Sequence, residues 1–295
     1  MPSKNSLATI KSILRMLVPL GVGFFLVWQI YTNWQQVAVQ LRDTYPIFLI
    51  LAFVVNILLY PLAALSFHII LRTLNQKITF IKSFKIWILA NFAKYIPGTV
   101  WQYLGRIELA RQESIPRPVT LAALVYEVLT YLAAGVIWVL FYFQNTAVIS
   151  SLMVVLIFVL LLPKIIGIIR TKIARFREMP DTPLPPKTLV TLLAVNFFDF
   201  FVTGLAIWLL LAAFGPPTLD PIRLTAIYAF SWIVGYITFI APGGLGVADA
   251  TLAGLLAPHL GIGFASLVAI LLRLIILGNE LLLGALVWKQ WRKQK

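Results

Sequence analysis

The sequence contains no cysteine and few charged residues, and both deficits exclude whole classes of protein. Without cysteine there is no disulfide framework, no thiol nucleophile and no thiolate metal site. Charged residues make up 12% of the 295 residues and hydrophobic residues 61%, against roughly 25% and 45–50% in soluble domains. A soluble chain of this composition would expose more apolar surface than water tolerates, so we interpret the sequence as an integral membrane protein.

The common signatures of nucleotide-driven, hydrolytic and zinc-dependent proteins are also missing. The sequence has no Gly-x-x-x-x-Gly-Lys-Ser/Thr phosphate loop, no Gly-x-Ser-x-Gly elbow and no His-Glu-x-x-His run. Its only histidines are His68 and His259, which stand alone, and we expect neither to be a metal ligand. We therefore expect no metal and no cofactor.

Seven apolar stretches are long enough to cross about 30 Å of hydrocarbon, which takes about 20 helical residues. They cover residues 14–31, 47–71, 119–143, 147–169, 188–214, 222–240 and 264–288. The first follows Lys4, Lys11 and Arg15 and resembles a signal peptide, but no small-residue cleavage site follows it. An uncleaved signal anchor is therefore favoured.

Two shorter apolar segments, 84–96 and 246–257, have the length of half-helices. If the first enters and leaves by the same face while the second completes a crossing, nearly all basic loop residues fall on one side. Only Arg42 and Arg223 fall on the other, and Arg273 lies within a span. A hairpin at 246–258 would instead place the basic C-terminus outside, against the positive-inside rule.

We therefore predict an all-α polytopic membrane protein with about eight transmembrane helices plus a re-entrant half-helix segment. The expected location is the plasma (inner) membrane, with both termini cytoplasmic. The net charge of +14 then marks the cytoplasmic face and gives no case for nucleic acid. We expect a single transmembrane domain over 1–295, with halves at 1–169 and 188–295. The basic, proline-containing linker 170–187 between them is expected to attract anionic lipid rather than dock a protein partner.

Two interruptions break the helical pattern at membrane depth. The first reads Lys94-Tyr95-Ile96-Pro97-Gly98-Thr99-Val100-Trp101, with Gly105-Arg106 downstream, and the second reads Ala241-Pro242-Gly243-Gly244-Leu245-Gly246-Val247-Ala248-Asp249. Non-helical backbone persists in a membrane only where protein or a water-filled cavity surrounds it. Such breaks at corresponding places in two halves point to a transporter binding site and leave open a two-half pseudo-repeat. Ordinary kinked spans contain the same residues, which is the alternative.

These two motifs resemble the membrane region of lysylphosphatidylglycerol synthases, also known as the flippase-like membrane domain family. The Pro-Gly-Gly-x-Gly signature is the most specific part, and the spacing of the spans extends the resemblance over essentially the whole chain. The resemblance implies translocation of lipids between leaflets by a stand-alone membrane domain, without the soluble domain that aminoacylates lipid in the bifunctional members. The family pattern usually has a basic residue followed by Glu after the glycines, where this chain has Ala248 and Asp249.

A few ionisable residues fall in the spans, where a charge costs about 2.5–3.5 kcal/mol and calls for a partner inside the protein. Four of them are acids, which outnumber the cations, so some must be protonated or matched by a substrate or an ion. A protonated acid in the membrane would permit proton coupling. Arg106, followed by Glu108, is the natural second cation after Arg273 and is suited to phosphate. Half-helix N-termini after Gly98 and Gly246 would also favour an anion. A plain interhelical ion pair is the alternative for Arg273. The candidate substrate-binding residues are Pro97, Gly98, Gln102, Arg106, Glu108, Glu127, Asp199, Pro242, Gly243, Gly244, Gly246, Asp249, Arg273 and Glu280.

The leading hypothesis is a flippase-like transporter of a phospholipid or lipid-linked headgroup, and not an enzyme. The headgroup would move through a polar cavity lined by the two broken segments, while the acyl tails stay in lipid. The expected partners are membrane lipids with anionic phosphate headgroups, and the chain could also form a homo-oligomer. One alternative is an integral membrane transferase acting on lipid-linked substrates, with Glu127 or Asp199 as general base. Another is a lipid-binding scaffold that transports nothing.

Overall fold

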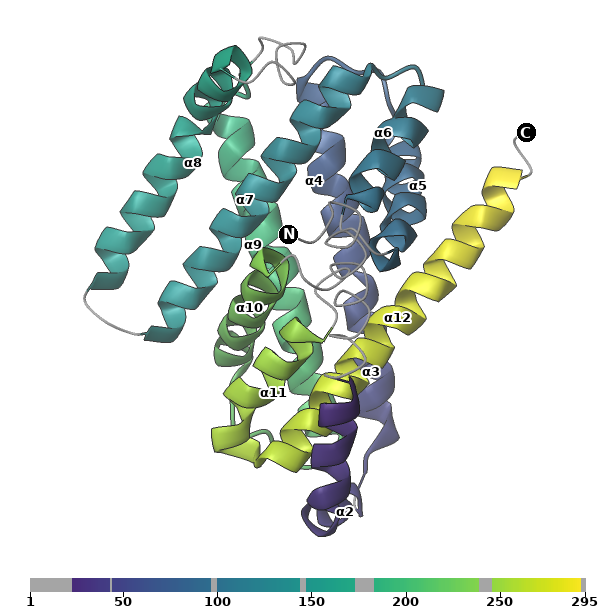
Figure 1. Cartoon of the computed structure of the whole chain (residues 1–295), viewed down its shortest axis with the longest axis vertical. Coiled ribbons are helices and arrows are strands. Elements are labelled where there is room, and N and C mark those ends of the chain that lie inside the picture. Colours follow the sequence, from purple (N-terminus) through teal and green to yellow (C-terminus); the bar gives the residue numbers. More distant parts are fainter. Residues whose placement is uncertain are drawn as a thin grey trace, which may run out of the picture. The chain divides into compact units, whose positions relative to one another are not determined.

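A computed structural model describes residues 23–42, 44–96, 100–143, 147–172, 183–238 and 246–292. Within these ranges the regular structure is entirely helical, as predicted, with eleven α-helices and one short 3-10 helix (Figure 1). In chain order they are α2 (Trp34–Leu41), α3 (Pro46–Ile57), α4 (Leu59–Thr73), α5 (Phe80–Asn91), η1 (Phe92–Tyr95), α6 (Trp101–Gln112), α7 (Arg117–Phe143), α8 (Ala147–Lys172), α9 (Pro186–Ala212), α10 (Pro221–Ile237), α11 (Val247–Leu260) and α12 (Ile262–Arg292).

Four helical stretches are long and apolar enough to cross a membrane. They are Pro46–Thr73, Arg117–Leu140, Pro186–Ala212 and Ile262–Lys289, and they confirm the spans predicted at 47–71, 119–143, 188–214 and 264–288. The predicted spans at 147–169 and 222–240 are helical as α8 and α10, and α10 has 17 residues. The span predicted at 14–31 is described from residue 23 onward and is helical there.

Short helices border both interruptions. Before the first, α5 has 12 residues and tightens into η1, which ends at Tyr95. After the second, α11 begins at Val247 and has 14 residues. Pro97, Gly98, Pro242, Gly243 and Gly244 themselves lie outside the described residues. The re-entrant path of the first segment and the sidedness of the termini stay predictions.

The chain folds into two compact units. Unit 1 comprises Met1–Asn56, Lys94–Trp101 and Thr203–Leu281, and unit 2 comprises Ile57–Ala93, Gln102–Val202 and Leu282–Lys295. Their boundaries fall within the apolar stretch Pro46–Thr73, within α9 and within α12. The units therefore alternate along the chain and differ from the halves drawn at the basic linker, because helices group by packing rather than by sequence order.

In unit 1, small residues let neighbouring helices approach closely. A Cβ atom at Gly235 of α10 would lie 2.7 Å from the Cβ atom of Ala248, at the start of α11. Gly204 of α9 is as crowded against Thr225 of α10, whose Oγ1 would lie 1.9 Å from an added Cβ atom. Close backbone approach is how membrane helices gain packing energy without a hydrophobic driving force. This packing fixes the start of α11, which carries Asp249.

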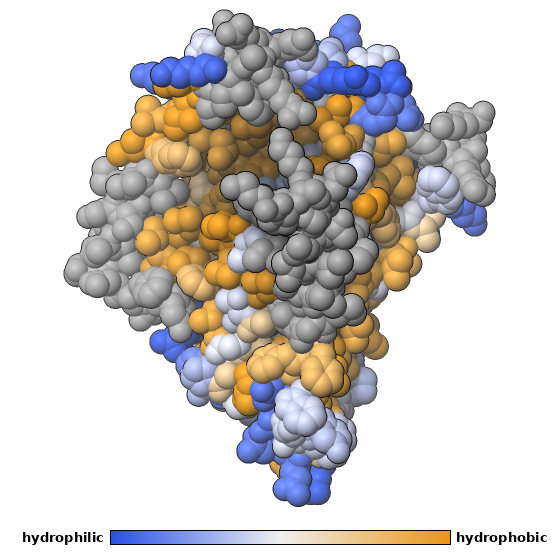
Figure 2. Space-filling model, in the orientation of Figure 1, coloured by the Kyte–Doolittle hydropathy of each residue, from blue (hydrophilic) through white to orange (hydrophobic). Residues whose placement is uncertain are grey.

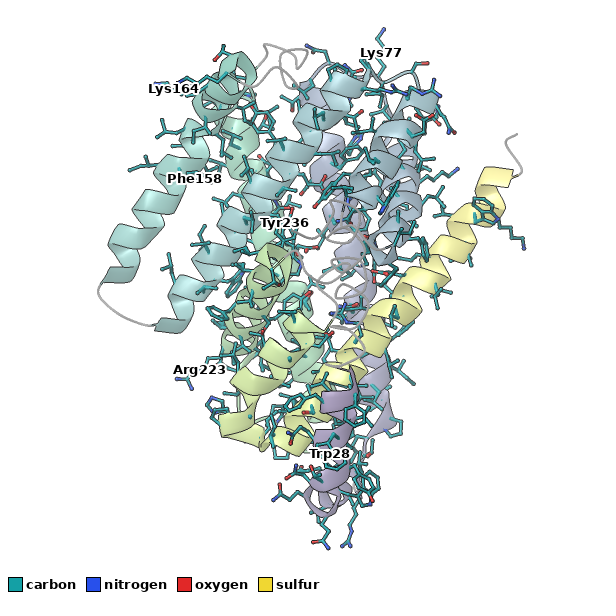
Figure 3. All side chains as sticks on the ribbon, viewed as in Figure 1. Trp28, Lys77, Phe158, Lys164, Arg223 and Tyr236 are labelled. Carbon is teal, nitrogen blue, oxygen red and sulfur yellow. The ribbon has the colours of Figure 1, made fainter. Side chains whose placement is uncertain are left out.

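In unit 2, α4, α5 and α7 share an apolar core that includes Phe67, Ile70 and Ile86. Lys77 and Lys164 lie at one end of this unit (Figure 3). Hydrophilic residues gather at that end, whereas hydrophobic residues dominate the rest of the visible surface of the unit (Figure 2). That division is the one expected of helices that stand in lipid with their loops in water.

Candidate functional site

In unit 2, an ion pair joins the short helix after the first break to the next long helix. Arg106 of α6 donates two hydrogen bonds of 2.7 Å from Nη1 to the carboxylate oxygens of Glu127 on α7. Trp87 of α5 donates from Nε1 to Glu127 Oε1 at 3.0 Å. The Arg106 and Glu127 side chains are 5% and 12% exposed. The predicted second cation is therefore bound to an acid from the candidate list.

Aromatic rings complete the surroundings of Arg106. Its guanidinium carbon lies 4.8 Å from the ring centre of Trp87 and 5.8 Å from that of Phe67. Such contacts stabilise a desolvated cation by about 2 kcal/mol or more. The Nε atom is buried and has no hydrogen-bond partner in the described part of the chain. Arg106 thus keeps one donor that a further acceptor could use.

Glu108 points elsewhere, although only two residues separate it from Arg106. Its carboxylate accepts a hydrogen bond of 2.6 Å from Arg111 Nη2 and lies 3.5 Å from Arg117 Nη2. This group of charges is exposed, and the Arg111 guanidinium, with help from Arg117, holds the pKa of Glu108 below its usual value. Gln102 is half-buried, one turn before Arg106 on α6.

Asp199 occupies a second polar position in unit 2, in the middle of α9, and is 1% exposed. Tyr131 of α7 donates its hydroxyl hydrogen to Asp199 Oδ2 at 2.7 Å. Asp199 Oδ1 is buried and has no hydrogen-bond partner among the residues that the structure describes. One turn earlier on α9, Asn196 accepts from Ser66 at 2.7 Å and donates to Thr130 at 3.0 Å.

In unit 1, the short helix after the second break also makes an ion pair with the next long helix. Arg273 of α12 donates to Asp249 Oδ1 from Nε at 3.0 Å and from Nη2 at 2.7 Å. The Gly246 amide donates to Asp249 Oδ2 at 3.0 Å. Gly246 has φ 85°, in the left-handed region that favours glycine. The carboxylate of Asp249 thus already sits at the α11 N-terminus, where we expected an anion.

The residues before the first break also bind α12. Lys94 donates to Glu280 Oε1, and the Tyr95 hydroxyl donates to Glu280 Oε2 at 2.5 Å. Glu280 lies seven residues after Arg273, so both occupy one face of α12 about two turns apart. In unit 1, the residues just before the first break and the acid just after the second break therefore bind the same helix, α12.

The candidate residues that the structure describes form two groups, with Gln102 and Glu108 in neither. Unit 1 brings together Gly246, Asp249, Arg273 and Glu280, and unit 2 brings together Arg106 and Glu127, with Asp199 next to the same helix α7. No group of three or more potential metal ligands occurs within the described residues. The acids Glu127, Asp249 and Glu280 are in ion pairs, whereas Asp199 makes none among the described residues.

A family model for the lysylphosphatidylglycerol synthase TM region matches residues 13–284, which is nearly the whole chain. The chain belongs to this family. The comparison with curated proteins returned no match. Family membership confirms the resemblance drawn from the two broken segments and makes this a membrane protein of a lipid-related family.

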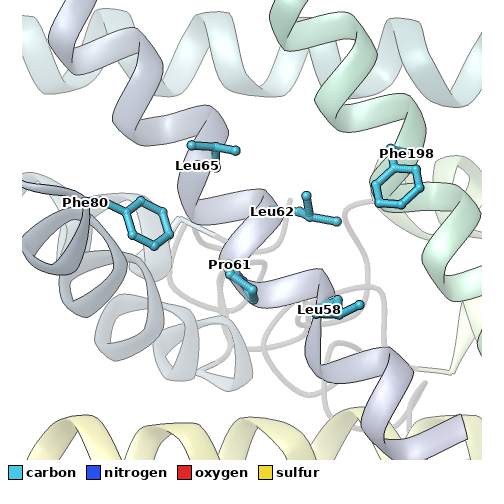
Figure 4. A pocket seen from close by; sticks show the side chains of 6 residues that line it. All are labelled: Leu58, Pro61, Leu62, Leu65, Phe80 and Phe198. Carbon is cyan, nitrogen blue, oxygen red and sulfur yellow. The ribbon is translucent and has the colours of Figure 1, made fainter. Parts of the chain in front are cut away.

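Unit 2 also has an apolar groove of about 340 Å³ (Figure 4). The side chains that line it come from the N-cap residue of α4 and from α4, α5 and α9, and are Leu58, Pro61, Leu62, Leu65, Phe80 and Phe198. Leu58 and Phe198 are each 50% exposed, so the groove is open at the surface of the unit.

The candidate residues chosen from the sequence did not include four side chains that form hydrogen bonds with the buried acids. Lys94 lies three residues before Pro97, and this place beside a break is the signal that could have identified it. Tyr95 adjoins the same break. Trp87 and Tyr131 gave no signal, because a tryptophan or tyrosine in an apolar run is typical of any membrane helix.

Proposed function

We propose that this protein translocates phospholipids between the leaflets of the membrane, as a transporter and not as an enzyme. The phosphate-bearing headgroup would bind in turn to the cations beside the two broken segments, chiefly Arg106 and Arg273. The lipid itself would leave chemically unchanged.

One observation carries the proposal: the cations and acids next to both breaks bind long helices. Lys94 before the first break binds Glu280, Arg106 after it binds Glu127, and Asp249 after the second break binds Arg273. Charges inside the membrane are costly and mark substrate or ion pathways by default. Transporters place such sites at discontinuous helices.

The chemistry of the paired groups suits a phosphate headgroup. Guanidinium groups offer forked donors that match phosphate oxygens, and Arg273 already uses Nε and Nη2 together on one carboxylate. Asp249 and Glu127 neutralise their arginines when no lipid is bound, so an arriving phosphate would exchange with a carboxylate instead of meeting a bare buried charge. The unused Nε of Arg106 offers an additional donor.

Acyl chains require no polar path. The groove of unit 2 is lined by six apolar side chains, two of which are half exposed, and it suits a hydrocarbon chain. A headgroup inside the protein with tails against its apolar flank would keep each part of the lipid in a matching environment.

Leaflet-resolved transport in proteoliposomes tests the proposal. The purified protein is reconstituted with a fluorescent phospholipid, and outer-leaflet label is followed by chemical quenching. We expect Arg106→Ala and Glu127→Gln to slow transport by about tenfold or more, which corresponds to about 1.4 kcal/mol. The exposed Arg111→Ala is the matched control and should transport at the wild-type rate. Wild-type rates in both site variants would contradict the assignment.

Lipid extraction from the same vesicles separates the competing functions. An unchanged lipid in the opposite leaflet supports transport. A new covalent lipid species would instead identify a transferase, and label that neither moves nor changes would identify a lipid-binding scaffold.

A further inference from the structure

We propose that Asp199 is a proton-binding site, neutral in the described conformation, whose proton is exchanged during lipid movement. The exchange rests on the proposed function, whereas the protonation does not. No other acid in the described spans has the same surroundings.

The first argument is the lack of a compensating charge. Glu127, Asp249 and Glu280 each bind a cation directly. Asp199 is 1% exposed and makes no ion pair within the described part of the chain. An isolated ionised carboxylate in an apolar interior is so unfavourable that the group takes up a proton instead.

The second argument is hydrogen-bond geometry. An ionised carboxylate offers about four acceptor positions, and buried ones are normally filled. Asp199 accepts one hydrogen bond, from the Tyr131 hydroxyl to Oδ2, and Oδ1 has no partner among the described residues. A carboxylic acid with its proton on Oδ1 leaves fewer acceptor positions unfilled, so this geometry favours the neutral form.

The third argument concerns the neighbouring groups. The titratable groups that act on Asp199 are Tyr131 and Glu127, both from α7. The Glu127 charge is engaged by Arg106, and no ion pair joins Asp199 to a cation among the described residues. On the same face of α9, Asn196 binds the neutral Ser66 of α4 and Thr130 of α7. Two carboxylates with one cation between them are more stable when one is neutral.

Proton exchange at Asp199 is a simple acid dissociation, in which the carboxylic acid becomes a carboxylate and releases one proton. Release leaves an uncompensated negative charge in unit 2 next to the Arg106–Glu127 pair. A conformation that hydrates Asp199 or brings a cation to it would then be favoured over the described one. A proton gradient could drive lipid movement through that preference.

Infrared spectroscopy tests the protonation directly, because the carbonyl stretch of a carboxylic acid is separate from the carboxylate bands. We expect the wild-type protein to show an acid band at neutral pH that Asp199→Asn removes. Glu113→Gln, which alters an acid paired with the half-exposed Lys82, should leave the band unchanged. A wild-type spectrum without the band, or a band that persists in Asp199→Asn, would overturn the proposal.

A pH gradient across proteoliposomes tests the exchange. The ratio of transport rates with and without the gradient should differ from one in the wild type and in Glu113→Gln, and equal one in Asp199→Asn. A gradient response retained by Asp199→Asn would refute the exchange even if lipid transport is real. An absence of wild-type transport would refute the proposed function, and the infrared result would still decide the protonation.

Discussion

Units 1 and 2 use the same arrangement of helices with opposite charges. In unit 2 the short helix after the break supplies the cation, Arg106, and the acid Glu127 follows 21 residues later on the next long helix. In unit 1 the short helix supplies the acid, Asp249, and the cation Arg273 follows 24 residues later. A break, a short helix and a paired long helix therefore recur, whichever partner carries which sign.

The two units differ in the partners of their second acid, which is Glu280 in unit 1 and Asp199 in unit 2. Glu280 in unit 1 accepts hydrogen bonds from Tyr95 and from Lys94, whereas Asp199 in unit 2 accepts one from Tyr131 and has no cation in the described part of the chain. Both acids of unit 1 are thus in ion pairs, whereas Asp199 of unit 2 makes none among the described residues. Under the proposed function, the ion-paired groups hold and release headgroups, and Asp199 binds a proton.

The largest effect is expected from Glu127→Gln. The substitution leaves the Arg106 guanidinium buried without a counter-charge, which costs about 3–5 kcal/mol. Thermal unfolding in detergent should show a clear loss of stability. The double variant Arg106→Met, Glu127→Gln should recover much of the loss, and an unaltered unfolding temperature in Glu127→Gln would contradict the ion pair.

A smaller loss is expected from Arg273→Ala in unit 1. Its pair with Asp249 is more exposed, at 19% and 14%, and Asp249 keeps the hydrogen bond from the Gly246 amide. We expect a loss of about 1–3 kcal/mol, the penalty of an imperfectly satisfied buried group. The free energy of unfolding in denaturant measures it. A loss as large as that of Glu127→Gln would mean that the two units are equally desolvated.

Lys94→Met should make unit 1 resemble unit 2. Glu280 would keep its hydrogen bond from Tyr95 and lose its cation, at about 1–2 kcal/mol near neutral pH. Unfolding temperatures of the variant and the wild type in detergent measure this loss. An unfolding temperature equal to that of the wild type would contradict the ion pair between Lys94 and Glu280.

The smallest effect is expected from Glu108→Gln, which lies outside both buried pairs. Arg111 and Arg117 hold the pKa of Glu108 below its usual value, so the stability from these contacts is present above the unfolded-state pKa and disappears as the pH falls through the folded-state pKa. Solvent screens exposed pairs strongly. We expect unfolding temperatures indistinguishable from wild type at neutral pH, and a loss comparable to that of Arg273→Ala would contradict the exposed position.

Local features of the sequence predicted the helices well. An apolar run of 20 residues and a Pro-Gly interruption are both local, and they predicted the long spans and the short segments 84–96 and 246–257. The structure places the short α-helices at 80–91 and 247–260. The orientation of Glu108 was also predictable, because residues two apart point to different sides of a helix and residues three apart share one. Glu108 accordingly binds Arg111, three residues later on the same helix.

The ion pairs and the units could not be predicted in the same way. Lys94 and Glu280 are 186 residues apart, and no local pattern links them. The two units depend on which helix faces pack together, and helices that are apolar on all sides give little indication of this. Counting acids and cations in the spans did indicate that some acids would lack a cation, but it did not identify Asp199.

The most direct test of the account compares buried with exposed cations in one leaflet-resolved transport assay. Lys94→Met, Arg106→Met and Arg273→Met should each slow phospholipid movement by about tenfold or more, while the exposed Arg111→Met and Arg223→Met should match the wild type. Equal rates in all five variants would contradict the claim that the paired cations beside the breaks bind the lipid headgroup.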